Sequence, residues 1–170
     1  NDVSLKARTN KANSLDVDVF VSIHANAFGS GGWNPAGGIE TYVHPSRPAV
    51  AYQLAQKIQR NLVLSTGLQN RGVKSADFHI LRETKMDAVL VECGFMTNAK
   101  EAKLLVSETY RKTCAEGIVK ALADQFRLQP KVKPVSSPAP ASNAPAPKSP
   151  RLYKVQVGAF AEKQHAEKLA

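Results

Sequence analysis

The sequence predicts an α/β fold, with a mainly parallel sheet and helices on both of its faces. Helix-like and strand-like segments alternate over residues 1–127, which is the order expected when strands are connected by helices that pack back onto the sheet. The strand-like segments are almost continuous apolar runs, as expected for strands that are covered on both sides. Hydrophobic residues make up 43% of the chain and aromatic residues only 6%, so we expect a substantial, aliphatic core.

The first expected elements are a helix ending near residue 15 (5–15), a strand over 18–24, a glycine-rich loop over 28–38 and a second strand over 39–44. Short apolar runs mark the strands, and glycines mark the loop. An amphipathic helix follows and is expected to end at Gly67, because glycine commonly ends a helix. Its apolar residues recur at a spacing of four, which places them on one helix face; they are Val50, Leu54, Ile58 and Leu62.

Two further strands are expected over 78–81 and 88–93, where apolar runs recur. Asn98, followed three residues later by Glu101, resembles a capping box that begins a helix. The last helix is expected over 110–126, with Cys114, Ile118 and Leu122 at a spacing of four. Cys93 and Cys114 are the two cysteines of the chain. We expect both to be small core residues, since unpaired cysteine is usually buried.

A proline-rich segment divides the chain. Residues 128–150 hold seven of the ten prolines, and such a composition predicts an extended linker that cannot bury a core. Residues 151–170 read as a strand and then a helix, but twenty residues are too few to fold alone. We therefore expect a globular region over 1–127, a linker over 128–150 and the beginning of a second domain over 151–170. The chain begins at Asn1 without methionine, as expected of a piece of a longer protein.

The net charge of +9 is spread along the chain, and residues 1–127 carry +4 of it. No basic stripe with interleaved aromatic residues is present, so nucleic acid is not an expected partner. Two interpretations stay open, an anionic polymer or surface as the working environment and a solvated basic surface without a specific partner. No apolar run approaches the roughly 20 residues that a bilayer requires, and no membrane span is expected.

A histidine and a glutamate each stand where a predicted strand ends. His24 follows the apolar run 18–21, and Glu92 follows the run 88–91. In open α/β sheets, reacting groups collect at the carboxyl ends of strands. A metal ligand and a general base are the roles that these two side chains would fill there. The alternative for Glu92 is a carboxylate in a structural hydrogen-bond network. A serine or cysteine hydrolase has little support, because no G-x-S-x-G turn occurs and Cys93 is expected to be buried.

Four segments in this order resemble the zinc-dependent N-acetylmuramoyl-L-alanine amidases of the amidase-3 type: RTNKAN at 8–13, FVSIHANA at 20–27, GIETY at 38–42 and VLVECGFM at 89–96. The segment LYKVQVGAF at 152–160 resembles the start of a SPOR domain, a peptidoglycan-binding module of ferredoxin-like α+β topology. This pairing resembles sporulation-associated autolysins of bacteria. The resemblance covers nearly the whole chain, with the amidase domain incomplete at its N-terminus and the SPOR domain cut inside.

The resemblance implies hydrolysis of the amide that joins the lactyl group of N-acetylmuramic acid to L-alanine of the stem peptide. It implies Zn²⁺ held by two histidines and a glutamate, and it makes His24 the last of these ligands. The other histidine and the glutamate are expected to precede residue 1. Catalytic zinc sites need about three protein ligands, so the 170-residue chain itself is expected to be inactive. Glu92 takes the place of the catalytic glutamate, as general base and acid.

Three further residues are expected near this site. Glu40 matches a family glutamate and is expected to support the site through a hydrogen bond, with a structural or exposed acid as the alternative. Asn26 is expected to orient the loop after His24 or to contact substrate, and His79 to line the cleft, with an ordinary strand histidine as the alternative. Trp33 in the glycine-rich loop is interpreted as a substrate contact, with packing onto the core as the alternative.

Together these observations predict a peptidoglycan hydrolase that acts outside the bacterial cell or in its wall. Its expected partner is the glycan strand with its stem peptide, and we expect a monomer. The alternative function is an amidase-like protein that binds peptidoglycan without cleaving it. His24 and Glu92 argue against that alternative, because a domain that only binds has no evident need for both.

Overall fold

The computed structural model describes residues 3–129 and 156–157, and its centre is a mixed sheet with strand order β3-β2-β4-β1-β5. The strands are β1 (Val19–Asn26), β2 (Ile39–Val43), β3 (Asn70–Ser75), β4 (Asp87–Phe95) and β5 (Gln156–Val157). Among the described residues β1 pairs in parallel with β4 and with β5, β2 pairs in parallel with β3, and only β2 and β4 are antiparallel. The expected α/β fold with a mainly parallel sheet is therefore confirmed, with one antiparallel pairing in the middle.

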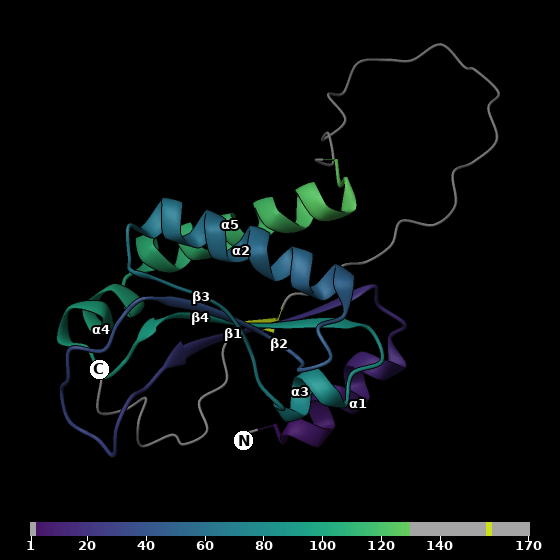
Figure 1. Cartoon of the computed structure of the whole chain (residues 1–170), viewed down its shortest axis with the longest axis horizontal. Helices are drawn as coiled ribbons and strands as arrows, with labels where there is room; N and C mark the ends of the chain where they lie inside the picture. The colour runs from purple at the N-terminus through teal and green to yellow at the C-terminus, as the bar shows by residue number, and fades with distance from the viewer. Residues whose placement is uncertain (1–2, 130–155, 158–170) are drawn as a thin grey trace, which may run out of the picture.

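Helices cover both faces of this sheet, as expected (Figure 1). They are α1 (Leu5–Ser14), α2 (Ala49–Thr66), α3 (His79–Arg82), α4 (Ala99–Leu105) and α5 (Glu108–Phe126). In Figure 1, α2 and α5 lie side by side above the sheet, α1 and α3 lie below it, and α4 lies at its left edge. None of the described helices combines the length and the apolarity that crossing a bilayer requires.

The two faces of the sheet bury two separate apolar clusters. Alternate residues of β4 divide between them, because successive side chains of a strand point to opposite faces. Val89, Val91 and Cys93 pack with α2 and α5 in the larger cluster, and Ala88 and Leu90 pack with α3 in the smaller one. The same alternation places the side chain of Glu92 on the face of the smaller cluster. Both cysteines are buried and unpaired, as expected.

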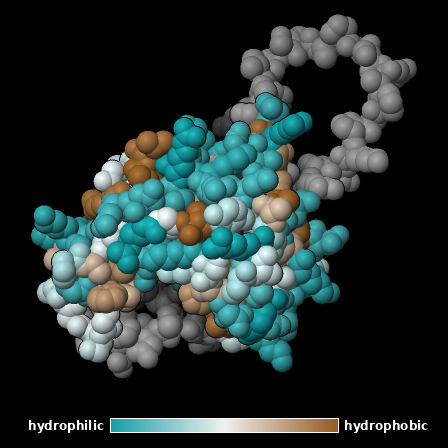
Figure 2. Space-filling model, viewed as in Figure 1, coloured by the Kyte–Doolittle hydropathy of each residue, from teal (hydrophilic) through white to brown (hydrophobic). Residues whose placement is uncertain are grey.

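The long helices agree with their predicted signals. Helix α2 ends before Gly67, whose φ of 70° is the left-handed conformation that glycine adopts without strain. Three of its four expected core residues, Leu54, Ile58 and Leu62, are buried, whereas Val50 is 39% exposed and the neighbouring Ala51 is buried instead. The exposed surface seen in Figure 2 is mostly hydrophilic, and its hydrophobic side chains form separate small patches.

Two predictions over residues 68–82 were wrong. The expected strand over 78–81 is the single helical turn α3, in which Ile80 and Leu81 are both buried. A short apolar run does not distinguish a strand from a helical turn. Strand β3 was missed because it lies at the edge of the sheet and has no buried residue, so it carries no apolar periodicity.

The capping box is present only in part. Asn98 Oδ1 accepts hydrogen bonds from the backbone N–H groups of Lys100 (3.0 Å) and Glu101 (3.3 Å), as an N-cap residue does. The Glu101 carboxylate does not return to Asn98 but accepts the backbone N–H of Phe95 at 2.8 Å. It therefore ties α4 to the last residue of β4. The predicted linker over 128–150 and the SPOR start over 151–170 fall almost entirely outside the described residues.

Candidate functional site

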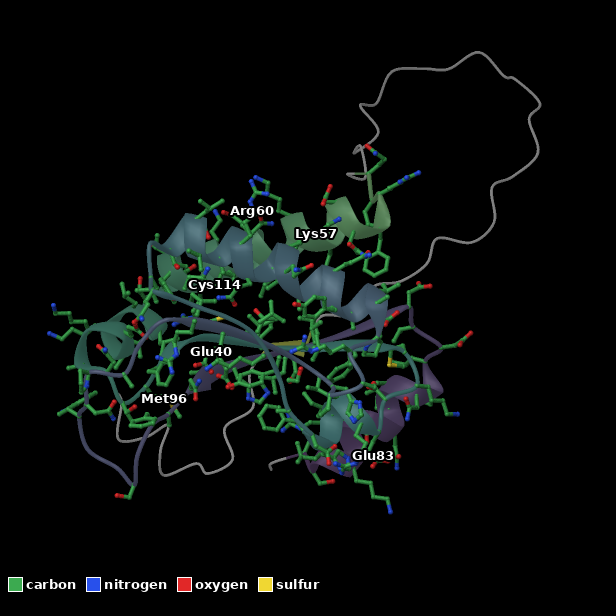
Figure 3. All side chains as sticks on the ribbon, in the orientation of Figure 1. Glu40, Lys57, Arg60, Glu83, Met96 and Cys114 are labelled. Atoms are coloured by element: carbon green, nitrogen blue, oxygen red, sulfur yellow. The ribbon has the colours of Figure 1, made fainter. Side chains whose placement is uncertain are left out.

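His24, Glu92 and Glu40 form a row across three adjacent strands. In the pairing of β1 with β4, His24 lies opposite Glu92, and in the pairing of β4 with β2, Glu92 lies opposite Glu40. Directly opposed residues of neighbouring strands point to the same face of a sheet. The three side chains therefore project together from the face that α1 and α3 cover. Figure 3 shows Glu40 at the level of the sheet, between Lys57 and Arg60 on one side and Glu83 on the other.

The strand directions explain why these side chains meet. His24 and Glu92 lie near the carboxyl ends of the parallel strands β1 and β4, where ligands of α/β sheets collect. Strand β2 runs the other way, so its first residues reach the same edge and bring Glu40 there. The polar row thus combines two strand ends with one strand beginning.

Glu92 is partly buried, and its Oε2 atom is fully enclosed with no hydrogen-bond partner among the described residues. Burial and, to a smaller extent, the negative charge of Glu40 together raise its pKa to about 8. A buried carboxylate oxygen without a partner is costly, and native structures rarely contain one without a functional reason. A carboxylate with a pKa near neutrality is suited to accepting and returning a proton.

The pKa of Glu40 is lowered, in contrast to that of Glu92, although the side chain of Glu40 is only 2% exposed. Burial alone would raise its pKa, but hydrogen bonds from Lys74, Tyr42 and Arg71 outweigh burial and lower the pKa to about 2. Its Oε1 accepts from Arg71 and from Lys74 (2.6 Å), and its Oε2 accepts from Tyr42 (2.5 Å) and Asn26 (3.2 Å). Glu40 is therefore permanently ionised and fully hydrogen bonded, which fits a supporting role better than proton transfer.

Asn26 connects the two sides of this row. Its side-chain amide donates to Glu40, while its own Oδ1 accepts the backbone N–H of Ala27 at 2.8 Å. Because β4 lies between β1 and β2, the bond from Asn26 to Glu40 spans the strand that carries Glu92. The amide of Asn26 thus fixes the beginning of the loop after β1.

His24 has the properties of a neutral ligand. Burial and the positive charge of Arg8 both lower its pKa, which favours the neutral imidazole that binds metals. Its Nε2 lies 2.7 Å from Ser22 Oγ. Among the described residues, no group of three His, Cys, Asp or Glu side chains is arranged to hold a metal ion. His24 can supply one ligand, and these residues alone do not form a zinc site.

The remaining sequence candidates lie elsewhere. His79 is in α3, where its Nε2 lies 3.3 Å from Thr9 Oγ1 of α1, so it belongs to the contact between these helices and not to the row. Trp33 is 66% exposed, which rules out the alternative that it packs onto the core.

Arg71 and Lys74 are the site residues that the sequence did not suggest. They are three positions apart, and in a regular strand such residues point to opposite faces. The register of β3 against β2 shifts by one residue between Asn70 and Val73. This irregularity lets both cations reach Glu40, as a bulge does when it changes the direction of a side chain. Two basic residues around Gly72 were the only signal in the sequence.

The comparisons with known proteins agree with this fold. The family model of the N-acetylmuramoyl-L-alanine amidases (Amidase_3) matches residues 1–124, and the chain belongs to this family. It is 37% identical over 168 residues to the N-acetylmuramoyl-L-alanine amidase CwlM of Bacillus licheniformis, and 35% identical over 170 residues to the sporulation-specific N-acetylmuramoyl-L-alanine amidase of Bacillus subtilis. Each alignment covers 99% of this chain and 57% of the relative, so the chain spans a little over half of their length.

Solved structures show the same fold. The crystal structure of an N-acetylmuramoyl-L-alanine amidase from Clostridium difficile 630 is 38% identical and superposes with a TM-score of 0.70, covering 74% of this chain and 66% of that one. The catalytic domain of CwlV from Bacillus (Paenibacillus) polymyxa is 35% identical with a TM-score of 0.67, covering 75% of this chain and 68% of that one. The α/β architecture is therefore that of the amidase family.

Proposed function

We propose that the protein is a zinc-dependent peptidoglycan hydrolase that cleaves the amide between the lactyl group of N-acetylmuramic acid and L-alanine of the stem peptide. Family membership supports the bond that is cleaved. The observation that carries the mechanism is Glu92, which lies opposite His24 near the ends of two parallel strands and whose enclosed Oε2 has no hydrogen-bond partner among the described residues.

In this mechanism Glu92 moves the proton. An unstrained amide resists attack by neutral water, so the water must lose a proton as its oxygen adds to the carbonyl carbon. Glu92 accepts that proton and passes it to the leaving nitrogen as the carbon–nitrogen bond breaks. The products are the lactyl carboxylate and the free amine of L-alanine. Zinc, when bound, supplies Lewis-acid polarisation of the carbonyl and of the water.

We propose His24 as one zinc ligand, held neutral by its burial. A histidine and a glutamate upstream of residue 1 complete the set, in keeping with the ligand number of catalytic zinc sites. Two observations support an incomplete set in this chain. The described residues contain no three-ligand cluster, and the chain spans 57% of two amidase relatives. The 170-residue chain alone is then inactive.

The proposed place of action is the bacterial cell wall. Relatives carry the names "sporulation-specific N-acetylmuramoyl-L-alanine amidase" and "probable cell wall amidase LytH", which supports action on the wall and a role in sporulation. The alignments with CwlM and with the sporulation-specific amidase continue past the amidase domain through nearly the whole chain. We propose that residues 151–170 begin a SPOR domain that binds peptidoglycan, and that the enzyme is a monomer.

The test is release of dye from labelled, purified peptidoglycan, by the chain extended upstream to its natural start. Glu92→Gln in the extended chain is expected to lower the rate by about 100- to 10,000-fold, the usual contribution of a general base. The matched control is Glu116→Gln, on an exposed face of α5, which should leave the rate unchanged. Removal of metal by a chelator should abolish the activity, and zinc should restore it.

Three outcomes would contradict the proposal. Full activity in Glu92→Gln would remove Glu92 from the mechanism. Tight binding of peptidoglycan by the extended chain without release of stem peptide would instead support a binding protein. Zinc-dependent hydrolysis by the 170-residue chain itself would show that the ligand assignment is wrong.

A further inference from the structure

The loop over residues 27–38 connects β1 to β2 and exposes two aromatic side chains. Trp33 is 66% exposed and Phe28 is 60% exposed. Most large apolar side chains of the described residues are buried in the two clusters, so leaving both rings in water is costly. Exposed aromatic surface of this kind commonly marks a place where another molecule binds.

This loop is attached to the site at both of its ends. It begins directly after Asn26, and the backbone N–H of Phe28 donates to Thr97 Oγ1 at 3.1 Å. After the tip, the N–H of Asn34 donates to the carbonyl of Thr97 at 2.9 Å, and its side-chain amide donates to the carbonyl of Phe28 at 2.9 Å. Thr97 lies in the turn after β4, the strand that carries Glu92.

The returning end of the loop is packed as closely as its beginning. Asn98 donates to the carbonyl of Ala36 at 3.2 Å, and a Cβ atom on Gly37 would collide with the side chains of Glu101 and Asn98. The tip, in contrast, has open space around its glycines Gly29, Gly31 and Gly32, all of which have positive φ. The two aromatic residues are thus presented from a base that is held against the end of β4.

The composition of the loop restricts what it can bind. Residues 27–38 contain no charged side chain, so a carboxylate of the stem peptide or an anionic lipid finds no counter-ion there. A pyranose ring has an apolar face of C–H bonds and an edge of hydroxyl and amide groups. Aromatic faces match the former, and the backbone N–H and carbonyl groups of a glycine-rich tip match the latter.

We propose that Trp33, assisted by Phe28, binds a sugar ring of the peptidoglycan glycan strand. This places the glycan along the edge of the sheet where β1 and β4 end, so that the lactyl amide of a bound sugar can reach Glu92. The inference rests on the proposed function, because it takes peptidoglycan as the substrate. Beyond the proposed function, it specifies that this loop recognises the glycan part of the polymer.

Trp33 is the single tryptophan of the chain, so its fluorescence reports on this contact without any catalysis. The 170-residue chain is titrated with soluble glycan strands that have been stripped of stem peptides. A saturable blue shift and protection from acrylamide quenching are expected. Free stem peptide, at the same concentrations, should change neither. A glycan that leaves the emission unchanged, or a stem peptide that shifts it equally, would overturn the proposal.

Co-sedimentation with insoluble peptidoglycan provides the test by mutation. Trp33→Ala is expected to weaken binding about tenfold, as loss of an aromatic anchor does, and Trp33→Phe should restore part of it. The control is Leu64→Ala, which removes a side chain that is 73% exposed on α2 and should bind like the parent. Equal binding by Trp33→Ala and Leu64→Ala would refute the assignment.

The same variants in the upstream-extended enzyme separate this inference from the proposed function. There Trp33→Ala should raise KM for polymeric peptidoglycan about tenfold, while Leu64→Ala changes neither KM nor kcat. If hydrolysis depends on Glu92 but not on Trp33, the amidase proposal stands and the glycan contact is wrong. If the glycan shifts the Trp33 emission but the extended chain hydrolyses nothing, the contact stands and the amidase proposal is wrong.

Discussion

Glu40 and Glu92 lie opposite each other on adjacent strands, yet their surroundings push their pKa values in opposite directions. Two cations, a phenol and an amide stabilise the charge of Glu40, whereas the enclosed oxygen of Glu92 has no such donor. Pairs of carboxylates whose environments separate their pKa values commonly divide the work of an active site. In the proposed mechanism this difference suits Glu92 for proton transfer and Glu40 for structural support.

The low pKa of Glu40 predicts a loss of stability in acid. A carboxyl group with a pKa of about 2 in the folded protein, against 4.5 as its ordinary value, stabilises the fold above pH 4.5. That contribution, about 3 kcal/mol, is lost as the pH falls from 4.5 towards 2, because the unfolded chain takes up the proton first. The free energy of urea unfolding, measured from pH 7 to pH 2, should therefore fall across this window.

Glu40→Gln supplies the comparison for that measurement. It should be less stable than the parent at pH 7, since Arg71 and Lys74 lose their shared partner. Its free energy of unfolding should also change less between pH 4.5 and pH 2. Glu116→Gln, which alters an exposed carboxylate, should follow the parent curve. A Glu40→Gln curve parallel to that of the parent would show that Glu40 does not carry the effect.

At the scale of the elements, the connection between β4 and α4 holds the site together. The turn after β4 binds the loop that carries Trp33, the helix α4 begins there, and Glu101 returns to the end of β4. Helix α4 has only seven residues, and so short a helix depends on its cap and its packing more than on propensity. The N-cap residue Asn98 therefore influences both the helix and the loop.

Asn98→Ala is expected to lower the free energy of unfolding by about 1 kcal/mol, the usual cost of losing an N-cap. It should also increase acrylamide quenching of Trp33, because the bond from Asn98 to Ala36 is lost. Asn98→Asp separates the two effects. It keeps the capping oxygen and loses the amide donor, so the stability should be largely retained while the quenching still increases. Unchanged quenching in both variants would show that this bond does not hold the loop.

At the scale of the whole molecule, stability and function are placed on different faces of the sheet. The larger cluster, between the sheet and α2 and α5, contains most of the fully buried side chains. The opposite face carries the smaller cluster together with the polar row. The larger cluster buries most of the apolar surface, so it is expected to supply most of the hydrophobic stabilisation, and Glu40 and the smaller cluster add to the stability from the other face.

Ile58→Ala tests this division. Ile58 of α2 is completely buried, and its truncation should cost about 2 to 5 kcal/mol of unfolding free energy, as for other large core side chains replaced by alanine. Leu64→Ala on the same helix should change the stability by less than about 0.5 kcal/mol, because Leu64 is exposed. Thermal or urea unfolding measures both. Similar small effects in the two variants would show that the α2 face is not the main source of stability.

A part of the core depended on contacts that no local pattern contains. Gln59 is 4% exposed on α2, where it accepts from Thr41 and donates to the carbonyl of Ile39 and to Asn70. It thereby joins α2 to two strands. A glutamine in an amphipathic helix is ordinarily a solvent-facing residue, and its partners lie at sequence separations of 11 to 20 residues. Only the assembled fold makes it part of the core.

The sequence by itself determined the α/β class, the ends of the long helices and the positions of His24 and Glu92 at strand ends. These features depend on apolar periodicity, on glycines that end helices and on capping residues, all of which act over a few neighbouring residues. The tertiary structure alone decided that β2 runs antiparallel to β4, that Glu40 completes the row, and that an irregular β3 brings Arg71 and Lys74 to it. Strand direction and register are set by pairing between distant segments. The opposite pKa values of two glutamates follow from that pairing, which no local pattern encodes.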